Sequence, residues 1–489
     1  MSSRFLRAVD SGAPAPWKAE ERGLEPVPPE GRYGTLRGIL WTWMAANIGV
    51  LGITMGSGLV TGLGLNLWQA IIAALLGSVG SFVFVAMISM SGPLSGAPAM
   101  MASRATFGIR GNLAPTIVSW VVLAGWEVAM CTTATFALVS ALDTLGVPTG
   151  PWITAPAALF LVTGAAAISY FGHATIVWVQ KWLGWVLGGL TLVVCVMSVT
   201  TIDWAAVAAA PSANFAAVLG GIGVIAAGTG VGWFSAGGDY TRYLPQTVRL
   251  PRLLGATILG AVVPLMVLIS TGSLLALGEP AEDGGGNVVG SVGLVLPDWL
   301  LVPYLITAML GLITAADLSM YSSSLDLQVA GLPLSRRRAV LVNAVPIVLA
   351  TIYISVFSQG FFTIFTTLIT LFALPLAAWV GVFGVDLLFR RSLSPEDLAD
   401  TSADSAYWFR GGFHWPAIGA WVLAIVLGLL CTRVQVGDAV WFSGPLAETW
   451  VGRNSLGWLV SGISASAFFW VLEPLTDSGH RPGRAHPEE

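Results

Sequence analysis

Two glycine-rich stretches decide the fold of this chain: GVLGITMGSG at residues 49–58 and AAGTGVGWFSAGG at residues 226–238. Each lies inside a long apolar segment. Glycine lowers the stability of a helix by about 1 kcal/mol relative to alanine, so such clusters favour local unwinding of a helix at membrane depth. The alternative interpretation is close packing, because small residues spaced by four let membrane helices approach each other. We expect these structural or gating roles for Gly52, Gly230 and Gly232.

The segments around these stretches predict an all-α membrane protein. Of the 489 residues, 55% are hydrophobic and 10% are charged, whereas soluble domains carry about a quarter charged residues. About twenty apolar residues in a helix cross a hydrocarbon core of roughly 30 Å. Windows of this length predict twelve spans, at residues 39–62, 67–91, 114–142, 152–171, 174–200, 215–237, 254–278, 299–325, 339–358, 361–389, 416–433 and 456–474.

The basic residues indicate which side of the membrane each loop occupies, because short cytoplasmic loops are enriched in Lys and Arg. If the N-terminus is cytoplasmic, only Arg433 and Arg453 of the 22 basic residues fall on the outer side. An odd error in the number of spans would distribute the basic residues over both sides of the membrane. We therefore expect a multi-pass protein of the cell membrane with both termini in the cytoplasm.

The two glycine-rich stretches lie five spans apart. Because five is an odd number, the second block of five helices enters the bilayer from the opposite face, as in an inverted-topology repeat with discontinuous helices at its centre. We expect the first and sixth spans to be broken. The units expected are a cytoplasmic tail (1–37), a first repeat (38–200), a second repeat (215–389), two extra spans (410–475) and a cytoplasmic C-terminal tail (476–489).

Several classes of protein are excluded by missing motifs. Neither lysine belongs to a GxxxxGK[ST] phosphate loop, no HExxH pairs the histidines, and no GxSxG elbow lies beside a usable acid and histidine. Cys131, Cys195 and Cys431 lie far apart in apolar stretches and read as buried free thiols. We expect no enzyme, no cofactor, no metal and no nucleic-acid partner. A secondary transporter or a channel remains, and the oligomeric state stays open.

Acidic residues inside the spans are the next candidates, because a charge at the bilayer centre costs about 3 kcal/mol or more and usually marks a pathway or relay. Glu127 lies mid-span in GWEVAMC and Asp317 lies deep in the eighth span. Either could carry a coupling proton, or serve as a neutral hydrogen-bond donor. For Asp239 and Asp326 we favour structural capping, or pairing with Arg242 and with the arginines at 336–338.

Two tryptophans differ from the interfacial majority of this residue type. Trp126 lies mid-span beside Glu127, and Trp233 follows the glycine-rich GTGVG. Two indole faces near the midplane could hold a flat heterocycle between them. Core packing is the equally weighted alternative.

Seven segments, in order and each at the expected span, resemble the nucleobase:cation symporter-1 family, in its purine-cytosine permease branch, nearly end to end. They are EERGLEPVPPEGR (20–32), WTWMAANIGVLGITMGSG (41–58), GPLSGAPAMMASRATFGIRGN (92–112), FGHATIVWVQKWLGW (171–185), GWFSAGGDYTRYLP (232–245), PLAAWVGVFGVDLLFRR (375–391) and RGGFHWPAIGAWVLAIVLG (410–428).

This resemblance implies a LeuT-like fold of two inverted five-helix repeats plus two extra helices, and uptake of a nucleobase or related heterocycle with a proton or sodium ion. It implies that Trp126 stacks on the substrate, that Trp233 closes the opposite side, and that Asn47 and the backbone near Gly49 supply polar contacts. The family commonly has amides where this chain has Met130 and Ser319. Losing both amides removes partners for a base edge, which puts cytosine or adenine as the substrate in doubt.

The resemblance leaves the coupling ion open. Sodium-coupled relatives have a Ser-Thr pair in the eighth span, where this chain has Ile313 and Thr314. Because Na⁺ favours oxygen ligands, Ile313 argues for protons carried by Glu127 or Asp317, with a sodium site using backbone oxygens as the alternative. The competing functions are symport of an amino acid, an osmolyte or a vitamin precursor on the same scaffold, and a channel or non-transporting receptor.

Overall fold

The computed structural model describes residues 14–200, 202–278, 298–358, 361–390, 392–436 and 439–473. The expected C-terminal tail, 476–489, lies outside the described residues. In chain order the elements are η1 (Pro29–Gly31), α1 (Leu36–Ala46), α2 (Val50–Thr61), α3 (Leu67–Ser89), α4 (Ser91–Ser95), α5 (Ala99–Ala102), α6 (Arg104–Phe107), α7 (Leu113–Thr144), α8 (Pro151–Phe171), α9 (His173–Thr200), α10 (Trp204–Ala209), α11 (Phe215–Gly228), η2 (Val231–Ala236), α12 (Leu250–Gly278), α14 (Asp298–Val329), α15 (Arg336–Phe357), α16 (Phe361–Phe389), α17 (Pro395–Ala399), α18 (Trp415–Leu430), β1 (Arg433–Val436), β2 (Ala439–Ser443), α19 (Trp450–Arg453) and α20 (Gly457–Leu472).

The described helices account for the expected spans in three ways. Nine helical segments are long and apolar enough to cross a membrane by themselves, and α1 and α2 together make a tenth span that is bent by 57°. The last two spans correspond to α18 and α20, which are apolar but have only 16 residues each. At 1.5 Å per residue such a helix is about 24 Å long, shorter than a typical hydrocarbon core.

The eleventh span ends earlier than its hydropathy predicts. We expected it to reach Arg433, but α18 ends at Leu430 and the chain turns into an antiparallel hairpin of β1 and β2. The reason is local: RVQV, at the start of the hairpin, alternates apolar and polar residues with the period of a strand. β-Branched valines also favour extended backbone over helix.

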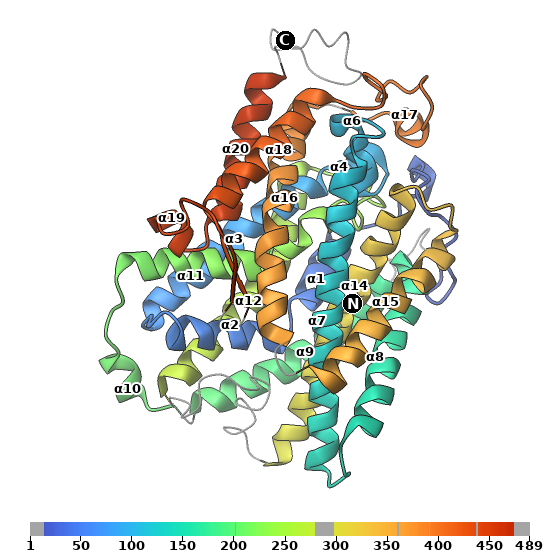
Figure 1. Ribbon diagram of the computed structural model, residues 1–489. Coiled ribbons are helices and arrows are strands. Elements are labelled where there is room, and N and C mark those ends of the chain that lie inside the picture. The colour runs from blue at the N-terminus through green and yellow to red at the C-terminus, as the bar shows by residue number, and fades with distance from the viewer. Residues whose placement is uncertain are drawn as a thin grey trace.

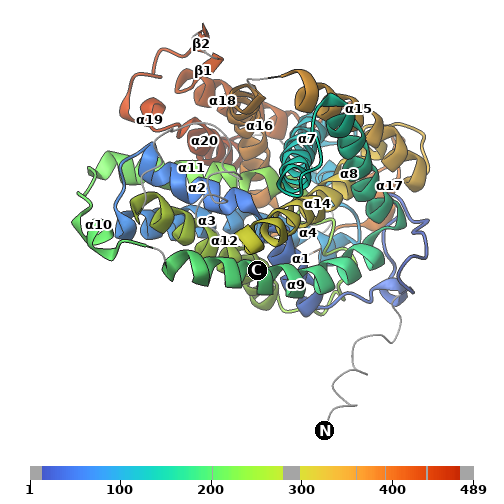
Figure 2. The same ribbon diagram turned by 90° about the horizontal axis from the view of Figure 1, so that it is seen from below.

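The helices around the centre form two groups. The first contains α1, α2, α3, α11 and α12, and the second contains α7, α8, α14 and α15, each packed mainly within its own group. In Figure 1 most of the first group lies to the left of α7 and most of the second to its right. The helix α9 packs against α1 and α12 as well as α14 and α8, and Figure 2 shows it lying along both groups.

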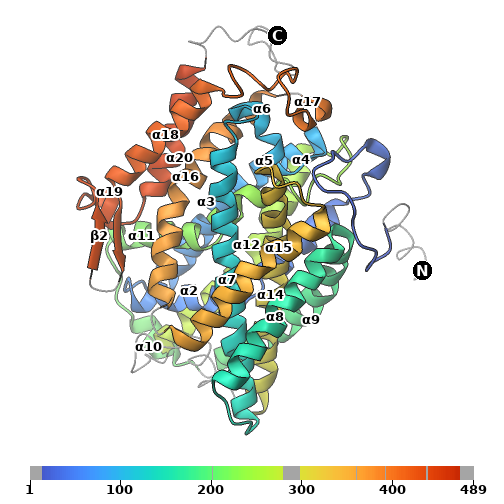
Figure 3. The ribbon, with the colours of Figure 1, turned by 45° about the vertical axis from the view of Figure 1, so that its right-hand side comes forward.

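The C-terminal elements pack on the outside of this arrangement. The helices α18 and α20 contact each other and α16, which in turn contacts α3, α7 and η2. Figure 3 shows them with the hairpin and α19 on one flank of the molecule. The two extra spans are thus peripheral to the two helix groups. The three cysteines are buried free thiols, as expected.

The polar N-terminal segment is attached to the helix ends on one side of the bundle. Glu20 accepts from Arg242 Nη2 at 2.8 Å and from the backbone N–H of His173 at 2.8 Å. Arg242 Nη1 also donates to the Gly23 carbonyl at 2.7 Å. Farther along, Arg32 donates to the carbonyl of Pro93 at 2.7 Å. Residues 17–34 therefore form an ordered cover over this end of the helices.

Candidate functional site

The first span breaks where the sequence predicts. The helix α1 ends at Ala46, Asn47 has φ −110° and ψ 4°, and α2 begins at Val50 after an extended Gly49. The Asn47 side chain stabilises this end, because its Nδ2 donates to the Trp43 carbonyl at 2.8 Å. Carbonyls in the last turn of a helix lack intrahelical partners, so the amide satisfies one of them.

The sixth span breaks at Thr229. The helix α11 ends at Gly228, Thr229 has φ −114° and ψ −90°, and the chain continues as the 3₁₀ helix η2. The Thr229 hydroxyl donates to the Ile225 carbonyl at 2.6 Å, and Ser81 of α3 accepts from the N–H of Gly230 at 3.2 Å. Side chains thus replace the backbone hydrogen bonds that the break removes.

The glycines of the first stretch divide between the two expected roles. Gly49, at the break, has open space where a side chain would be. Gly52 and Gly56 instead pack on α12: a Cβ at Gly52 would lie 2.7 Å from Leu268 Cβ, and one at Gly56 would overlap the Ile269 carbonyl. Close packing is therefore the role of Gly52 and Gly56, and the break belongs to Asn47–Gly49.

Gly230 and Gly232, in the second stretch, also make room for neighbours. A Cβ at Gly230 would lie 2.5 Å from Ser81 Oγ, and one at Gly232 would overlap the indole nitrogen of Trp126. Gly232 thus lets the Trp126 ring lie directly against the backbone that follows the break.

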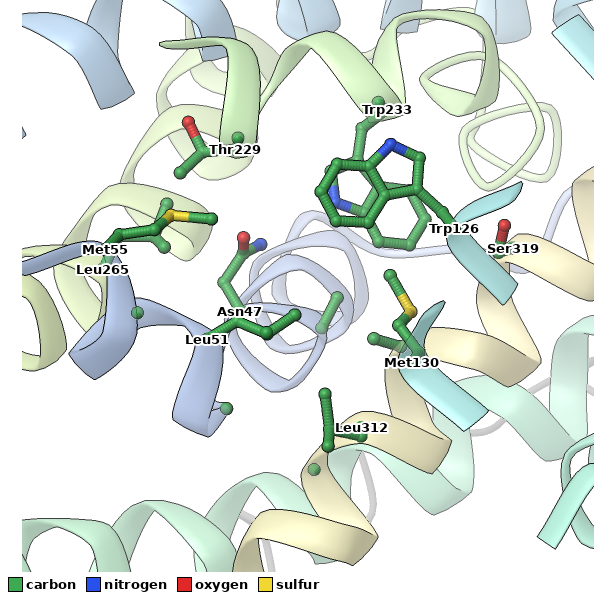
Figure 4. Close-up of a pocket in the computed structure, with 17 residues that line it drawn as sticks. Asn47, Leu51, Met55, Trp126, Met130, Thr229, Trp233, Leu265, Leu312 and Ser319 are labelled. Atoms are coloured by element: carbon green, nitrogen blue, oxygen red, sulfur yellow. The ribbon is translucent and has the colours of Figure 1, made fainter. Parts of the chain in front are cut away.

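A cavity of about 60 Å³ lies where the two breaks face α7 and α14. Figure 4 shows its walls, with Asn47 and Thr229 at the breaks and Trp126, Met130 and Ser319 opposite them. It is lined by Ala46, Asn47, Gly49, Leu51, Gly52, Met55, Trp126, Met130, Gly228, Thr229, Gly232, Trp233, Leu265, Gly311, Leu312, Ala315 and Ser319. The first helix group and the second each contribute one side.

All six residues expected to bind substrate line this cavity: Asn47, Gly49, Trp126, Met130, Trp233 and Ser319. Sequence reasoning missed Thr229 and the apolar residues Leu51, Met55, Leu265 and Leu312. Thr229 could have been found, because it stands between two glycines in the second stretch. The apolar residues carry no signal that distinguishes them from other membrane-helix residues.

The two tryptophans are held in different ways. Trp126 lies against Gly232, while the ring of Trp233 makes an edge contact with Trp43, at 5.6 Å between centroids and 82° between planes. Trp43 is fully buried. Trp126 is thus supported by the backbone of η2 and Trp233 by a residue of α1, and both indoles line the cavity (Figure 4).

The polar groups of the cavity lie mostly on the side of the breaks. Asn47 and Thr229 directly follow α1 and α11, whereas the side formed by α7 and α14 offers one hydroxyl, that of Ser319. That hydroxyl donates to the Leu123 carbonyl at 3.1 Å. A ligand meets hydrogen-bonding groups on one edge and mainly apolar atoms on the other.

Neither candidate coupling acid lines the cavity. Glu127 is fully buried between α7, α14 and α15, where it accepts from Ser323 at 2.6 Å and from Asn343 at 2.9 Å. Asp317 lies between α14 and α9, where it accepts from Gln180 at 3.2 Å. The Thr314 hydroxyl donates to the Gly311 carbonyl of its own helix at 2.7 Å.

The two other acids have structural surroundings, but not the arginine partners considered above. Asp239 accepts from the N–H of Ala99, the first residue of α5, at 2.8 Å, and Asp326 accepts from Ser119 at 2.5 Å. In the described part of the chain Arg242 forms its ion pair with Glu20 instead. Among the described residues neither acid forms an ion pair, so of the two alternatives capping describes Asp239.

A family model described as permease for cytosine/purines, uracil, thiamine, allantoin matches residues 26–460. The chain belongs to this family. The match confirms the resemblance read from the seven motifs, and it makes the protein a membrane permease and not an enzyme.

Known relatives agree with this assignment. The permease is 24% identical over 472 residues to YxlA of Bacillus subtilis, which carries the name of a purine-cytosine permease, covering 93% of this chain and 96% of YxlA. It is 22% identical over 272 residues to the purine-cytosine permease FCY2 of Saccharomyces cerevisiae, covering 54% of this chain and 49% of FCY2.

The fold is that of a solved transporter. Mhp1, a nucleobase-cation-symport-1 family transporter in a closed conformation with bromovinylhydantoin bound, matches the permease with a TM-score of 0.71 at 17% identity, covering 93% of this chain and 95% of Mhp1. An inward-facing conformation of Mhp1 gives a TM-score of 0.63 at 16% identity, covering 95% and 96%. The LeuT-like fold class is confirmed.

Proposed function

We propose that the permease imports a nucleobase or a related flat heterocycle by symport with a cation, through alternating access to the cavity. The observation that carries this proposal is a mostly apolar cavity at two helix breaks, with Trp126 and Trp233 in its walls. Indole rings offer large flat faces for ring stacking. The family description names cytosine, purines, uracil, thiamine and allantoin, each of which contains a nitrogen heterocycle.

The distribution of polar groups orients the ligand in this proposal. Its hydrogen-bonding edge faces Asn47, Thr229 and the open backbone at the breaks, where donors and acceptors are concentrated. The opposite edge faces Met130 and Leu312. An amide at position 130 or 319 would hold a second polar edge, so the present residues favour a ring with one polar edge and one apolar edge or substituent.

Binding requires side chains to move, because about 60 Å³ has room for only a few water molecules. Met55 and Met130 are suited to this adjustment, since methionine is unbranched and changes conformation at low cost. Ligand binding is therefore expected to rearrange the cavity walls, with Trp126 and Trp233 closing on the ring.

For the cation we favour a proton over sodium. Ile313 stands where sodium-coupled relatives have a hydroxyl, and the Thr314 hydroxyl hydrogen is used within α14. The two buried acids next to the cavity helices, Glu127 and Asp317, are the candidate carriers. The location we propose is the cell membrane, with both termini cytoplasmic.

The test is a thermal-stability screen of the purified permease with uracil, cytosine, adenine, hydantoin, allantoin, thiamine and a set of amino acids. A compound at a hundredfold its Kd stabilises by about 2.7 kcal/mol, which is easily detected as a rise in Tm. We expect one or more heterocycles to stabilise the protein. Stabilisation by amino acids alone would overturn the heterocycle proposal and favour the second candidate.

A stacking role for Trp126 is tested in the same assay. Trp126→Ala should weaken binding of the stabilising heterocycle about tenfold or more, because ring stacking contributes roughly 0.5–1.5 kcal/mol beyond area burial. Trp68→Ala is the matched control, since Trp68 is 72% exposed on α3, away from the cavity. Equal binding by the two variants would contradict the stacking role.

A further inference from the structure

Asp317 is a buried acid whose carboxyl group is only partly hydrogen-bonded. It is fully buried, and the hydrogen bond described for its carboxyl group is the one donated by Gln180 to Oδ1 at 3.2 Å. The same Gln180 nitrogen donates to the Thr314 carbonyl at 2.6 Å. Gln180 lies in α9 and is fully buried as well.

Two oxygens of this pair lack a partner among the described residues: Asp317 Oδ2 and Gln180 Oε1. Both are acceptors if the carboxyl group is ionised, so neither can satisfy the other. A hydrogen on Oδ2 changes this, because a carboxylic acid can donate to an amide carbonyl while it accepts from the amide N–H. One proton is enough to satisfy both side chains.

No cation in the described chain compensates a charge on Asp317. None of the ion pairs found there includes it. On α9, Lys181 lies over the ring of Trp182, at 5.8 Å from its centroid. The helix α8 contains no charged residue, and α1 has one, Arg37, in its first turn. An unpaired ionised carboxylate costs several kcal/mol when buried, so this environment favours the neutral acid.

The other titratable groups near Asp317 are occupied elsewhere. Tyr240, which follows η2, donates to the Leu318 carbonyl at 2.7 Å. On α7, Glu127 accepts from Ser323 and Asn343, which satisfy both of its carboxyl oxygens. Both carboxyl oxygens of Glu127 therefore have hydrogen-bond partners, whereas one oxygen of Asp317 has none among the described residues. This difference favours Asp317 as the proton carrier.

We propose that Asp317 and Gln180 form the proton site of the transport cycle. An O–H bond forms at Asp317 Oδ2 with a proton that enters from the outer solution, and the acid pairs with Gln180. The bond breaks when the proton leaves to cytoplasmic water, and Asp317 Oδ2 and Gln180 Oε1, both now acceptors only, then repel each other. Protonation thus fastens α9 to α14, and proton release loosens it.

This contact lies about two turns of α9 from the break in the first span. Gly184, four residues after Gln180, faces α1: a Cβ there would lie 3.5 Å from Ala45 and from Trp41. One turn farther, a Cβ at Gly188 would lie 3.4 Å from Ile48, within the break. The rings of Trp41 and Trp185 also pack, at 4.7 Å between centroids. A movement of α9 away from α14 would therefore act on α1 and Ile48, next to Ala46, Asn47 and Gly49 in the wall of the cavity.

The first experiment needs no transport substrate. The carbonyl band of protonated carboxyl groups is followed by infrared difference spectroscopy while purified permease is titrated with acid and base. Asp317→Asn should lose one band, and Gln180→Leu should keep that band at the frequency of an acid without a hydrogen-bonded partner. Asp143→Asn, which changes an exposed aspartate near the end of α7, should leave the band that Asp317→Asn removes unchanged.

Two results would overturn the proton site. One is an Asp317→Asn difference spectrum identical to that of the unmodified permease, which would mean that Asp317 neither binds nor releases a proton during the titration. The other is a rise in Tm on replacing K⁺ with Na⁺ that Asp317→Asn abolishes, which would make the pair part of a sodium site.

The second experiment rests on the proposed function and uses radiolabelled uracil in proteoliposomes. One unit of pH gradient supports up to about tenfold accumulation by a one-to-one symporter. Asp317→Asn should reduce this ratio to about one while uracil exchange between the two sides continues. Accumulation equal to that of the unmodified permease would overturn the proton site. If the unmodified permease neither exchanges nor accumulates uracil, uracil is not its substrate, and the infrared result still decides the role of Asp317.

Discussion

Gly311 is the residue at which α14 meets the break in the first span. A Cβ at this position would overlap the carbonyl oxygen of Ile48 and lie 3.6 Å from Gly49 Cα. The backbone that lines the cavity therefore rests on a helix surface with no side chain. Gly311 was not among the residues expected from the sequence, because a single glycine in an apolar helix is normally a packing residue.

Gly311→Ala should destabilise the permease by about 1–3 kcal/mol, the usual cost of overpacking, because a backbone carbonyl has to move. It should also weaken binding of the stabilising heterocycle, since Gly49 lines the cavity. Thermal unfolding and ligand titration measure the two effects. Gly58→Ala is the control: open space surrounds Gly58, so this change should be neutral or slightly stabilising.

Met130 and Ser319 should determine which ring edges the cavity accepts. Met130→Gln combined with Ser319→Asn places two amides on the apolar side and should increase the affinity for cytosine or adenine about tenfold or more, at roughly 1 kcal/mol for each new hydrogen bond. Met130→Leu with Ser319→Ala, which changes size without adding amides, is the control. Equal cytosine affinity in both double variants, measured by titration, would mean that these positions do not contact the base edge.

For single residues, the sequence predicted those site residues that belong to a local sequence pattern. Asn47, Gly49 and Trp233 stand at the two helix breaks, which the glycine clusters predict. The sequence could not separate Glu127 from Asp317, because their partners are remote. Gln180 is 137 positions from Asp317, and Asn343 is 216 positions from Glu127.

At the scale of elements, the N-terminal segment binds the bundle through one carboxylate. Glu20 contacts Arg242, the Tyr243 hydroxyl and the N–H of His173. Burial, the largest single effect, would raise the pKa of Glu20, but the positive charges of Arg242 and Arg336 and the hydrogen bonds from Tyr243 and His173 together hold the pKa below its ordinary value of 4.5. The attachment is therefore complete above about pH 4.5, where the unfolded group is also ionised, and is lost as the pH falls through the lowered pKa.

Glu20→Gln should release this segment at neutral pH, because it leaves the buried Arg242 without its counter-charge, a loss that typically costs about 3–5 kcal/mol. Limited trypsin digestion after Lys18 and Arg22 should become faster, and Tm should fall. Glu30→Gln changes an exposed residue of the same segment and should do neither. Unchanged digestion of Glu20→Gln would show that the other contacts, such as those of Arg32, are sufficient.

Hydropathy predicted the positions of the elements better than their ends. The expected spans coincide with helices because apolar length is a property of the segment alone. The early end of α18 and the hairpin after it depend on alternation in RVQV, a short signal within a longer apolar region. The cover formed by residues 17–34 could not be predicted, because the residues that attach it to the bundle, such as Pro93, His173 and Arg242, are distant in the sequence.

At the scale of the whole molecule, the orientation in the membrane is open to a direct test. The three native cysteines are buried, so a membrane-impermeant maleimide should label intact cells mainly at an introduced cysteine. Ser212→Cys, before α11, should be labelled, and Ser402→Cys, after α17, should be labelled only after the cells are opened. Both serines are exposed. The reverse pattern would place the termini outside.

The helix α12 determines how the broken first span can move. It touches α2 where Gly56 meets Ile269 and Gly272 meets Ile53, and it touches α1 where Gly260 lies against the Leu40 carbonyl. One continuous helix of 29 residues is therefore fitted to both arms of the 57° bend. Because α12 packs on both α1 and α2, it keeps the angle between these two helices fixed. The cavity would then be exposed to either solution when α1, α2 and α12 move together, as one rigid body, relative to α7 and α14.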